Sequence, residues 1–413
     1  MNLKKLQICG VSVLLVACSN ESVKTGNEVA VRTPSSAITI PAYDIAKMPA
    51  ELGETWDPIA DTAKATAIGD SLSGFITNRD KTKSTTNRTF HPKHHGCVKA
   101  DFAINPSSLP EAYRVGVFSQ AANYQSWIRF SNGDQNGENS PDLPKDVRGM
   151  AVKLLNVDHT PTGSQDFVMC TAKEFFAKGA ADYVALNKIA VGGFENTVVF
   201  GIDWLTDPVV REDVAKAAAA TIQIASPLET YYYSATPYKL GSKNTMKFFV
   251  QPCAGQGTHA LPDPKTARPN YLSEVLQSSI SAQSKCFDFL VQPNMNPGVQ
   301  SIEDPRIVWD WKSSPAYKVA TITIHADSDI HSLNGVKDRD NFCENLSFDP
   351  WHTQVDTRPV GEIGRVRGLL YQRMSTVRHT QNATLAAGAL PEPRSLDNPC
   401  VGEEAKLCQV PHH

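Results

Sequence analysis

Several common sequence features are missing from this chain of 413 residues. There is no Cys-x-x-Cys pair to suggest a zinc site. There is no glycine-rich phosphate loop and no internal repeat, and no apolar run after Cys18 is long enough to span a bilayer. The formal net charge is only -3, so the strong basic excess that would favour nucleic acid as a partner is missing too.

The N-terminus carries the clearest local signal. Two lysines precede a short apolar run that ends at Ala17, a pattern typical of a secretory signal peptide over residues 1–17. The next residue, Cys18, resembles the lipidated cysteine of the bacterial lipobox. This implies an exported protein, anchored by lipid at the cell envelope and facing the periplasm or the cell surface. Ser19 favours the outer membrane in a Gram-negative host. The alternative is an ordinary signal peptide in which Cys18 occurs by chance.

The rest of the chain divides into three expected segments. Residues 18–86 form a polar tether and an arm, residues 87–382 a compact domain, and residues 383–413 a tail. Of nine cysteines, one lies in the leader and one is Cys18, which leaves seven. In an oxidising compartment some of these should pair, and the odd number predicts at least one that is free or paired outside the chain. Cys400 and Cys408 are the pair that we expect.

Hydrophobic periodicity predicts a mixed fold. Short runs with β-type alternation or apolar density occupy residues 98–104, 125–131, 149–155, 166–170, 244–253 and 317–326. Helical patterns occupy residues 60–76, 180–190, 212–225 and 268–283. Because the strands mostly precede the helices, without regular βαβ alternation, we expect the α+β class with an antiparallel sheet or barrel.

One further helix places three functional side chains on a single stripe. In "RVRGLLYQRMSTVRH" (365–379), Arg367, Tyr371 and Arg378 occupy positions i, i+4 and i+11. Because arginine keeps its charge, this arrangement favours a phenolate over a phenol, and a phenolate suits a hard, positively charged metal centre. The simpler interpretation is a surface helix with scattered arginines and one half-buried tyrosine.

Five other stretches decide between these interpretations. They read RTFHPKHHG (88–96), WIRFSNG (127–133), DVRGMAVKL (146–154), QDFVMCTAKEFF (165–176) and CENLSFDPWH (343–352). Their order and spacing, with the helix above, resemble the haem catalase superfamily, and within it the small catalase-related members that lack the C-terminal domain of large catalases. The resemblance covers residues 88–378. It implies a catalase-like antiparallel β-barrel with surrounding helices.

The resemblance also implies a haem b cofactor and roles for nine residues. Tyr371 matches the axial ligand of the haem iron, and Arg367 matches the residue that keeps this phenol ionised. His91 matches the distal histidine, which acts as base and acid in turn, and Ser131 matches the serine that hydrogen-bonds it. The other matches are arginines that bind haem propionates and aromatic residues that line the haem pocket: Arg88, Arg129, Arg378, Phe176 and Tyr183.

Two positions depart from large catalases. Their distal asparagine, which helps to position peroxide, is matched by Thr171, or by Cys170 if the register slips. We take Thr171 as the catalytic candidate, although its single hydroxyl offers less than an amide. Phe90 stands where large catalases have a small β-branched residue. Both changes disfavour fast dismutation of peroxide and leave peroxidase-type turnover significant.

Two neighbouring residues have alternative interpretations. His95 competes with His91 for the distal role, because one residue is inserted between His91 and Arg129 relative to large catalases. Arg148 is interpreted as a structural ion-pair partner of Asp146 rather than as a haem contact.

Taken together, these features predict a haem-dependent oxidoreductase that decomposes hydrogen peroxide or organic hydroperoxides. Some members of the superfamily convert fatty-acid hydroperoxides into allene oxides with the same cofactor, so an isomerase or lyase is the alternative enzyme. A non-catalytic haem-binding envelope protein is the alternative from a different class. The expected partners are a small peroxide, an organic electron donor, and a membrane through Cys18. The oligomeric state stays open.

Overall fold

The computed structural model describes residues 36–83, 85–191, 206–333, 338–382, 391–397 and 399–409. All of them fall within one compact unit, Arg32–His413. The leader, Cys18 and most of the tether lie outside the described residues, so the lipid anchor stays a prediction. In the described part of the chain, no helix is both long enough and apolar enough to cross a membrane.

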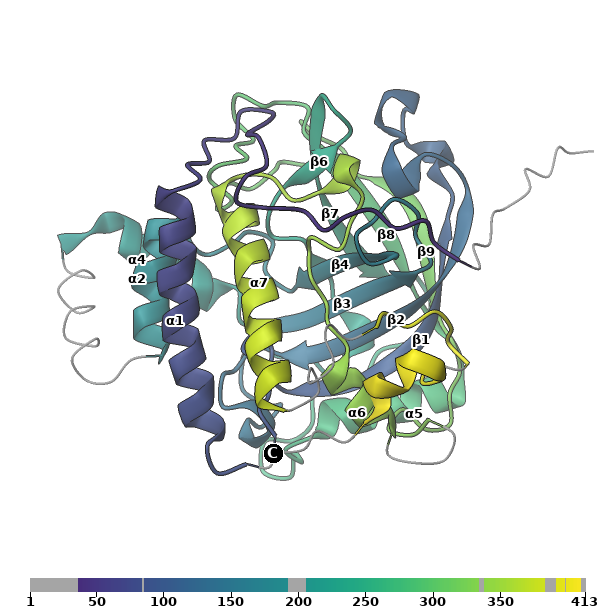
Figure 1. Ribbon diagram of the computed structural model, residues 1–413. Coiled ribbons are helices and arrows are strands. Elements are labelled where there is room, and N and C mark those ends of the chain that lie inside the picture. The colour runs from purple at the N-terminus through teal and green to yellow at the C-terminus, as the bar shows by residue number, and fades with distance from the viewer. Residues whose placement is uncertain are drawn as a thin grey trace, which may run out of the picture. The chain divides into compact units, whose positions relative to one another are not determined.

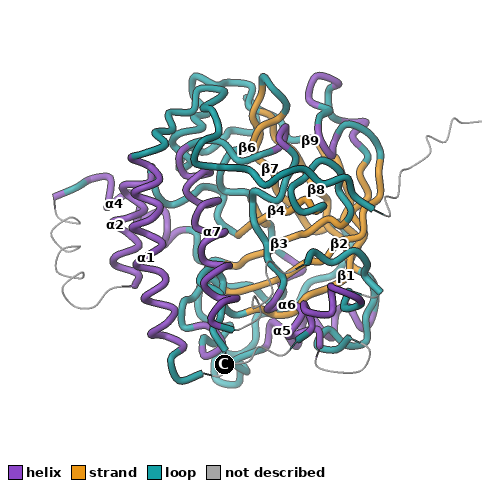
Figure 2. The backbone as a smooth tube through the Cα atoms, viewed as in Figure 1, coloured by secondary structure: helices purple, strands orange, loops and turns teal. Residues whose placement is uncertain are grey.

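An antiparallel β-barrel forms the centre of this unit (Figures 1 and 2). Nine strands run in the order β5-β4-β3-β2-β1-β9-β8-β7-β6, and an additional pairing of β5 with β7 closes eight of them into a ring. The strands are β1 (His94–Ile104), β2 (Ala122–Asn132), β3 (Arg148–Leu155), β4 (Ser164–Cys170), β5 (Tyr232–Tyr233), β6 (Tyr238–Leu240), β7 (Asn244–Pro252), β8 (Lys285–Pro293) and β9 (Tyr317–Ile324).

Every second side chain of the strands points into the barrel and fills its interior. Val98, Ala100 and Phe102 of β1 are fully buried in its core, as the period of two in a strand requires when one face is inside. Aromatic rings meet across the interior, and Phe167 lies 4.7 Å from Phe289 between ring centroids. The interior of the barrel is therefore a packed hydrophobic core.

Helices cover the outer wall of the barrel. Figure 1 shows α1 (Ala60–Asp80), α2 (Ala180–Val191) and α7 (Glu362–Gln381) on one side of the barrel, where they share a hydrophobic cluster. Helix α4 (Pro208–Ala219) contacts α2, and both α5 (Tyr271–Ala282) and α6 (Asp338–Asn345) pack against β1. The α+β barrel expected from the sequence is therefore confirmed.

The helix predicted over residues 212–225 is displaced toward the N-terminus. It begins at Pro208, which fits the first helical position, and the Asp207 carboxylate accepts a hydrogen bond from the Val209 N–H. It ends at Ala219, before the β-branched residues Thr221 and Ile222, and Ile222 forms a bridge with Asp146 instead. The predicted extension to residue 225 is wrong, because strand-type residues follow the last alanine.

Cysteine pairing includes the one expected pair and two further pairs that the sequence did not predict. Three disulfides join Cys97 to Cys343, Cys253 to Cys286 and Cys400 to Cys408. Cys170 is the free cysteine of the described residues. Both the unpaired thiol and the Cys400–Cys408 pair are confirmed.

Candidate active site

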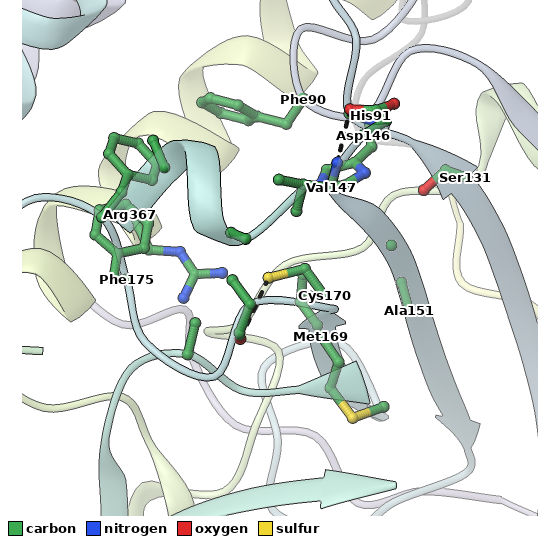
Figure 3. A pocket seen from close by; sticks show the side chains of 18 of the residues that line it. Phe90, His91, Ser131, Asp146, Val147, Ala151, Met169, Cys170, Phe175 and Arg367 are labelled. Atoms are coloured by element: carbon green, nitrogen blue, oxygen red, sulfur yellow. Dashed lines mark hydrogen bonds between the residues drawn. The ribbon is translucent and has the colours of Figure 1, made fainter. Parts of the chain in front are cut away.

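A cavity of about 630 Å³ lies between the outer wall of β2–β4 and the helices α2, α4 and α7. Figure 3 shows its side chains converging from these separate elements. The predicted site residues that line it are Arg88, His91, Arg129, Ser131, Phe176, Tyr183, Arg367 and Tyr371. Residues far apart in the chain therefore meet at one place, which is the first requirement of an active site.

Tyr371 and Arg367 are in contact on α7, as the helical spacing predicted. The guanidinium carbon of Arg367 lies 5.8 Å from the centroid of the Tyr371 ring, and its Nη1 donates a hydrogen bond of 2.8 Å to Thr236 Oγ1. Burial alone lowers the pKa of Arg367, but the phenol groups of Tyr371 and Tyr238 outweigh burial, so that its pKa is raised. A permanent positive charge thus stands beside the phenol, as a tyrosinate ligand would require.

His91 has the environment of a neutral base. Burial lowers its pKa to about 3, and the positive charges of Arg129, Arg367 and Arg148 act in the same direction. Its Nδ1 is buried and has no hydrogen-bond partner among the described residues. The backbone is left-handed, with φ of 54°, which costs of order 1–3 kcal/mol for a non-glycine residue and is typical of functional positions.

Gly149 makes room for His91 beside Ser131. A Cβ atom at Gly149 would lie 2.6 Å from Ser131 Oγ and 2.7 Å from His91 Nδ1. Any side chain at this position would displace one of the two groups. The absence of a side chain at Gly149 therefore leaves space for both groups on this strand. The hydrogen bond from Ser131 to His91 that the resemblance implies is not found among the described residues, because His91 Nδ1 has no partner there.

Three arginines meet around one carboxylate, that of Glu344 on α6. Arg129 Nη2 lies 3.6 Å and Arg88 Nε 4.0 Å from its oxygen atoms, and Arg378 Nη1 donates to its backbone carbonyl. Burial raises the pKa of Glu344, but Arg88, Arg129, His94 and Arg378 outweigh this and hold it at about 2. The predicted convergence of the arginines is found, although Arg378 does not itself line the cavity.

The charges of this cluster do not balance. Burial and the charge of Arg88 lower the pKa of Arg129 to about 9, and burial with the same neighbour also lowers the pKa of Arg378. The Nε atoms of Arg88 and Arg129 are buried without hydrogen-bond partners in the described part of the chain. Three guanidinium groups against one carboxylate leave room for further negative charge, and a group with two carboxylates would supply it.

Aromatic rings form the apolar part of the cavity wall. Phe175 stacks on Phe176 with ring centroids 4.5 Å apart, and Tyr183 meets Phe176 edge-on at 5.6 Å. Phe90 stacks on Tyr371 at 5.1 Å. The part of the wall around Tyr371 is therefore largely aromatic.

Thr171 lies outside the cavity lining. Its Oγ1 accepts a hydrogen bond of 3.0 Å from the Arg148 N–H and lies 3.5 Å from the Ala220 carbonyl. Cys170 lines the cavity instead, so the structure favours the other register that the sequence left open. The proposed catalytic role of Thr171 has no geometric support.

The two residues with alternative interpretations also lie outside the lining. His95 Nε2 is 2.9 Å from Asn132 Oδ1 and does not face the cavity, which favours His91 for the distal role. Arg148 pairs with Asp146 at 3.8 Å and donates to the carbonyls of Asp142 and Pro144. The structural interpretation of Arg148 is confirmed.

Sequence reasoning missed the partners of the predicted residues. Glu344 lies in the stretch CENLSFDPWH, where no local pattern shows that α6 brings it to the arginines. Gly149 lies in the stretch DVRGMAVKL, and only the strand register places it between Ser131 and Cys170.

Comparisons with known proteins show which sequences and folds this chain is similar to. No family model matches the chain. A catalase-related peroxidase from Mycolicibacterium paratuberculosis is 25% identical over 256 residues, which cover 61% of this chain and 77% of the peroxidase. A fungal catalase crystal structure aligns with a TM-score of 0.58 at 18% identity, and a bacterial catalase with 0.56 at 16%. The chain therefore has a catalase-like fold and is similar in sequence to a catalase-related peroxidase.

The match to solved catalases is partial in length. The alignments cover 75% and 80% of this catalase-like chain, but only 62% of the fungal and 63% of the bacterial catalase. Catalase A from Saccharomyces cerevisiae, with a TM-score of 0.56, is covered over 67% of its length. Because the identities to these structures are low, the similarity supports the fold alone.

Proposed function

We propose that this catalase-like protein binds haem b and reduces peroxides, with turnover of the peroxidase type. One observation carries the proposal: a single cavity contains the phenol of Tyr371 beside a buried arginine, and the buried imidazole of His91, whose Nδ1 has no hydrogen-bond partner in the described part of the chain. The similarity to a catalase-related peroxidase supports the choice of peroxide as substrate.

The side chains of the cavity are of the types that would bind the iron and the propionates of haem. Tyr371 would hold the iron, with its negative charge stabilised by Arg367. Arg88 and Arg129 have buried N–H groups free for the propionates, and Arg378 adds positive charge nearby. Bound haem would supply the electron transfer that breaks the peroxide O–O bond.

The chain itself would supply proton transfer and positioning. His91, neutral because its pKa is about 3, would accept the proton from one peroxide oxygen and return it to the other, which leaves as water or alcohol. Ser131, which like the imidazole borders Gly149, would orient the imidazole in the loaded protein. The aromatic wall of Phe175, Phe176 and Tyr183 would keep bulk water away from the reacting atoms.

We further propose export and lipid anchoring at Cys18, with a role at the cell envelope. The three disulfides of the described residues support an oxidising compartment. We expect the wild-type chain to incorporate radiolabelled palmitate and to be recovered in the membrane fraction. We expect Cys18→Ser to incorporate none. If the wild type and Cys18→Ser were recovered in equal amounts in the soluble fraction, the proposed lipid anchor would be wrong.

The function is tested by the absorption spectrum of the purified protein with and without peroxide. We expect a Soret band that changes on addition of peroxide, and we expect Tyr371→Phe to lose haem or to shift this band. Peroxide consumption that needs an added donor indicates a peroxidase, whereas oxygen release indicates dismutation. If the protein isomerised a lipid hydroperoxide without an electron donor, the chain would be an isomerase and not a peroxidase. If the haem-loaded protein reacted with none of these substrates, it would be a haem carrier.

A further inference from the structure

A second cavity, of about 250 Å³, is lined by residues of β5, β7 and β8 and of the loops that follow β4 and precede β9. Lys247 and Phe249 alternate along β7 with side chains of the barrel core, so both project outward. Val308 and Trp311, which also line the cavity, are 59% and 51% exposed. The cavity is therefore open to small molecules from solvent, and the proposed function makes no use of it.

Lys247 is buried in the wall of this cavity, with 6% of its surface exposed. Among the described residues its amine donates one hydrogen bond, of 3.2 Å, to the Ile307 carbonyl, and it lies 5.5 Å from the centroid of the Trp309 ring. Three other buried lysines each pair with a carboxylate: Lys93 with Asp142 at 2.7 Å, Lys153 with Asp166 at 2.8 Å and Lys239 with Glu51 at 2.7 Å. Burying an amine without such a partner costs free energy, which points to a chemical use for Lys247.

The amine of Lys247 gives up its proton more readily than that of an ordinary lysine. Burial lowers its pKa to about 8, although the charges of Glu174 and Asp304 oppose this and that of Lys216 supports it. At pH 8 roughly half of these amines are unprotonated, against less than about one in a hundred for a lysine of ordinary pKa. An unprotonated amine is a nucleophile, and a lysine desolvated in an apolar pocket is suited to imine formation with carbonyl compounds.

Aromatic rings form most of the wall around this amine. Phe249 stacks on Trp311 with ring centroids 5.3 Å apart and meets Tyr233 at 5.7 Å. The Nε1 of Trp309 is buried and has no hydrogen-bond partner in the part of the chain that the structure describes, so it is free to donate to a ligand oxygen. The cavity is smaller than the roughly 300–1,000 Å³ of sites for drug-sized ligands. These features fit a molecule with a single aromatic ring and a carbonyl group.

We propose that Lys247 is the nucleophile of a second site, which binds small aromatic aldehydes as imines. The Lys247 nitrogen forms a bond to the carbonyl carbon and gives up both of its protons, and the carbonyl oxygen leaves with them as water. One aldehyde and one amine therefore give one imine and one water, and nothing is oxidised or reduced. Glu174 lines the same cavity and can carry a proton from the nitrogen to the leaving oxygen. The inference goes beyond the proposed peroxidase function and does not depend on it.

The test treats the full chain, as purified, with benzaldehyde and sodium cyanoborohydride, which reduces an imine to a stable benzylamine. Peptide mass mapping at pH 7 should find Lys247 benzylated at least about tenfold faster than Lys173, an exposed lysine that lines the same cavity, because more of the Lys247 amine is unprotonated. Lys247→Arg keeps the positive charge without a nucleophilic amine and should give no such product. Lys173→Arg is the matched control and should leave the labelling of Lys247 unchanged. The unfolding temperature shows whether each variant is intact.

Two further probes test whether the cavity selects the aldehyde. Pyrene-1-carboxaldehyde, whose fused rings are too large for the cavity, should show no preference for Lys247. The inference is wrong if benzaldehyde labels Lys247 no faster than Lys173, or if the pyrene aldehyde shows the same preference as benzaldehyde. It is also wrong if benzoate protects Lys247 and no benzylated product forms, because the cavity would then be an anion site. Peroxide takes no part in these reactions, so their failure leaves the proposed function untouched.

Discussion

His91 is the residue on which proton transfer depends in the proposed reaction. We expect His91→Ala to keep its haem, since the cofactor is held from α7 and by the arginines, and to react with peroxide about 10²–10⁴ times more slowly. His95→Asn is the matched control, because His95 lies outside the cavity lining. Stopped-flow spectra of both variants check this. Loss of reactivity in His95→Asn with retention in His91→Ala would assign proton transfer to His95.

Glu344 should make the haem-free protein sensitive to acid. Its pKa is about 2 in the folded chain against an ordinary 4.5, so its stabilising effect is present above pH 4.5 and is lost as the pH falls toward 2. Glu344→Gln should lower the free energy of unfolding by roughly 3 kcal/mol at pH 6, and this deficit should shrink as the pH is lowered. Denaturant titrations at several pH values measure it, and a deficit independent of pH would show that the charge is not responsible.

The positions of individual side chains are the hardest feature to predict from the sequence. Tyr371 and Arg367 were predictable, because both lie on one helix and helical spacing fixes their relation. The choice between Thr171 and Cys170 was not, because a slip of one residue along a strand moves a side chain to the opposite face. Only the pairing of Cys170 with Gly149 settles which of the two faces the cavity.

Among the elements, α7 fixes the position of the site through close packing at Gly368. A Cβ at this residue would overlap the indole ring of Trp351 and lie 2.7 Å from Ile45 Cδ1, and Trp351 Nε1 donates to the Gly364 carbonyl. The helix that carries Tyr371 therefore packs directly against Trp351, and no space for an added methyl group remains between them. This contact joins residues of α7 to a loop that sequence periodicity does not place.

Gly368→Ala tests this packing. We expect a loss of about 1–3 kcal/mol in the free energy of unfolding, because the added methyl group must push α7 away from Trp351, together with weaker haem retention. Gly74→Ala on α1 is the matched control, since a Cβ there meets nothing within 4 Å. It should be neutral or stabilising by up to about 1 kcal/mol. Equal behaviour of the two variants in urea unfolding would contradict the packing argument.

At the scale of the whole molecule, the sequence predicted the α+β barrel class but not the contacts between distant segments. Glu54, in the arm that precedes the barrel, is one such contact: its carboxylate accepts hydrogen bonds from Arg358 and from Arg365 of α7. All three side chains are fully buried. Burial and these two arginines have opposite effects on the pKa of Glu54, and the net result is a pKa of about 2. Periodicity describes each element alone and cannot show such a contact.

The disulfide between Cys97 and Cys343 is another long-range tie, and it joins β1 to the helix that carries Glu344. It closes a sequence separation of 246 residues, against 8 for Cys400–Cys408. If a cross-link acts by restricting the unfolded chain, the longer loop stabilises by about 5 kcal/mol and the shorter by about 2.5 kcal/mol. Cys97→Ala with Cys343→Ala should therefore cost more stability in guanidinium unfolding than Cys400→Ala with Cys408→Ala. It should also release α6, so that haem dissociates faster from this variant alone. If the two pairs cost the same and haem dissociates equally fast from both variants, then the Cys97–Cys343 bond does not hold α6 in place around the arginines.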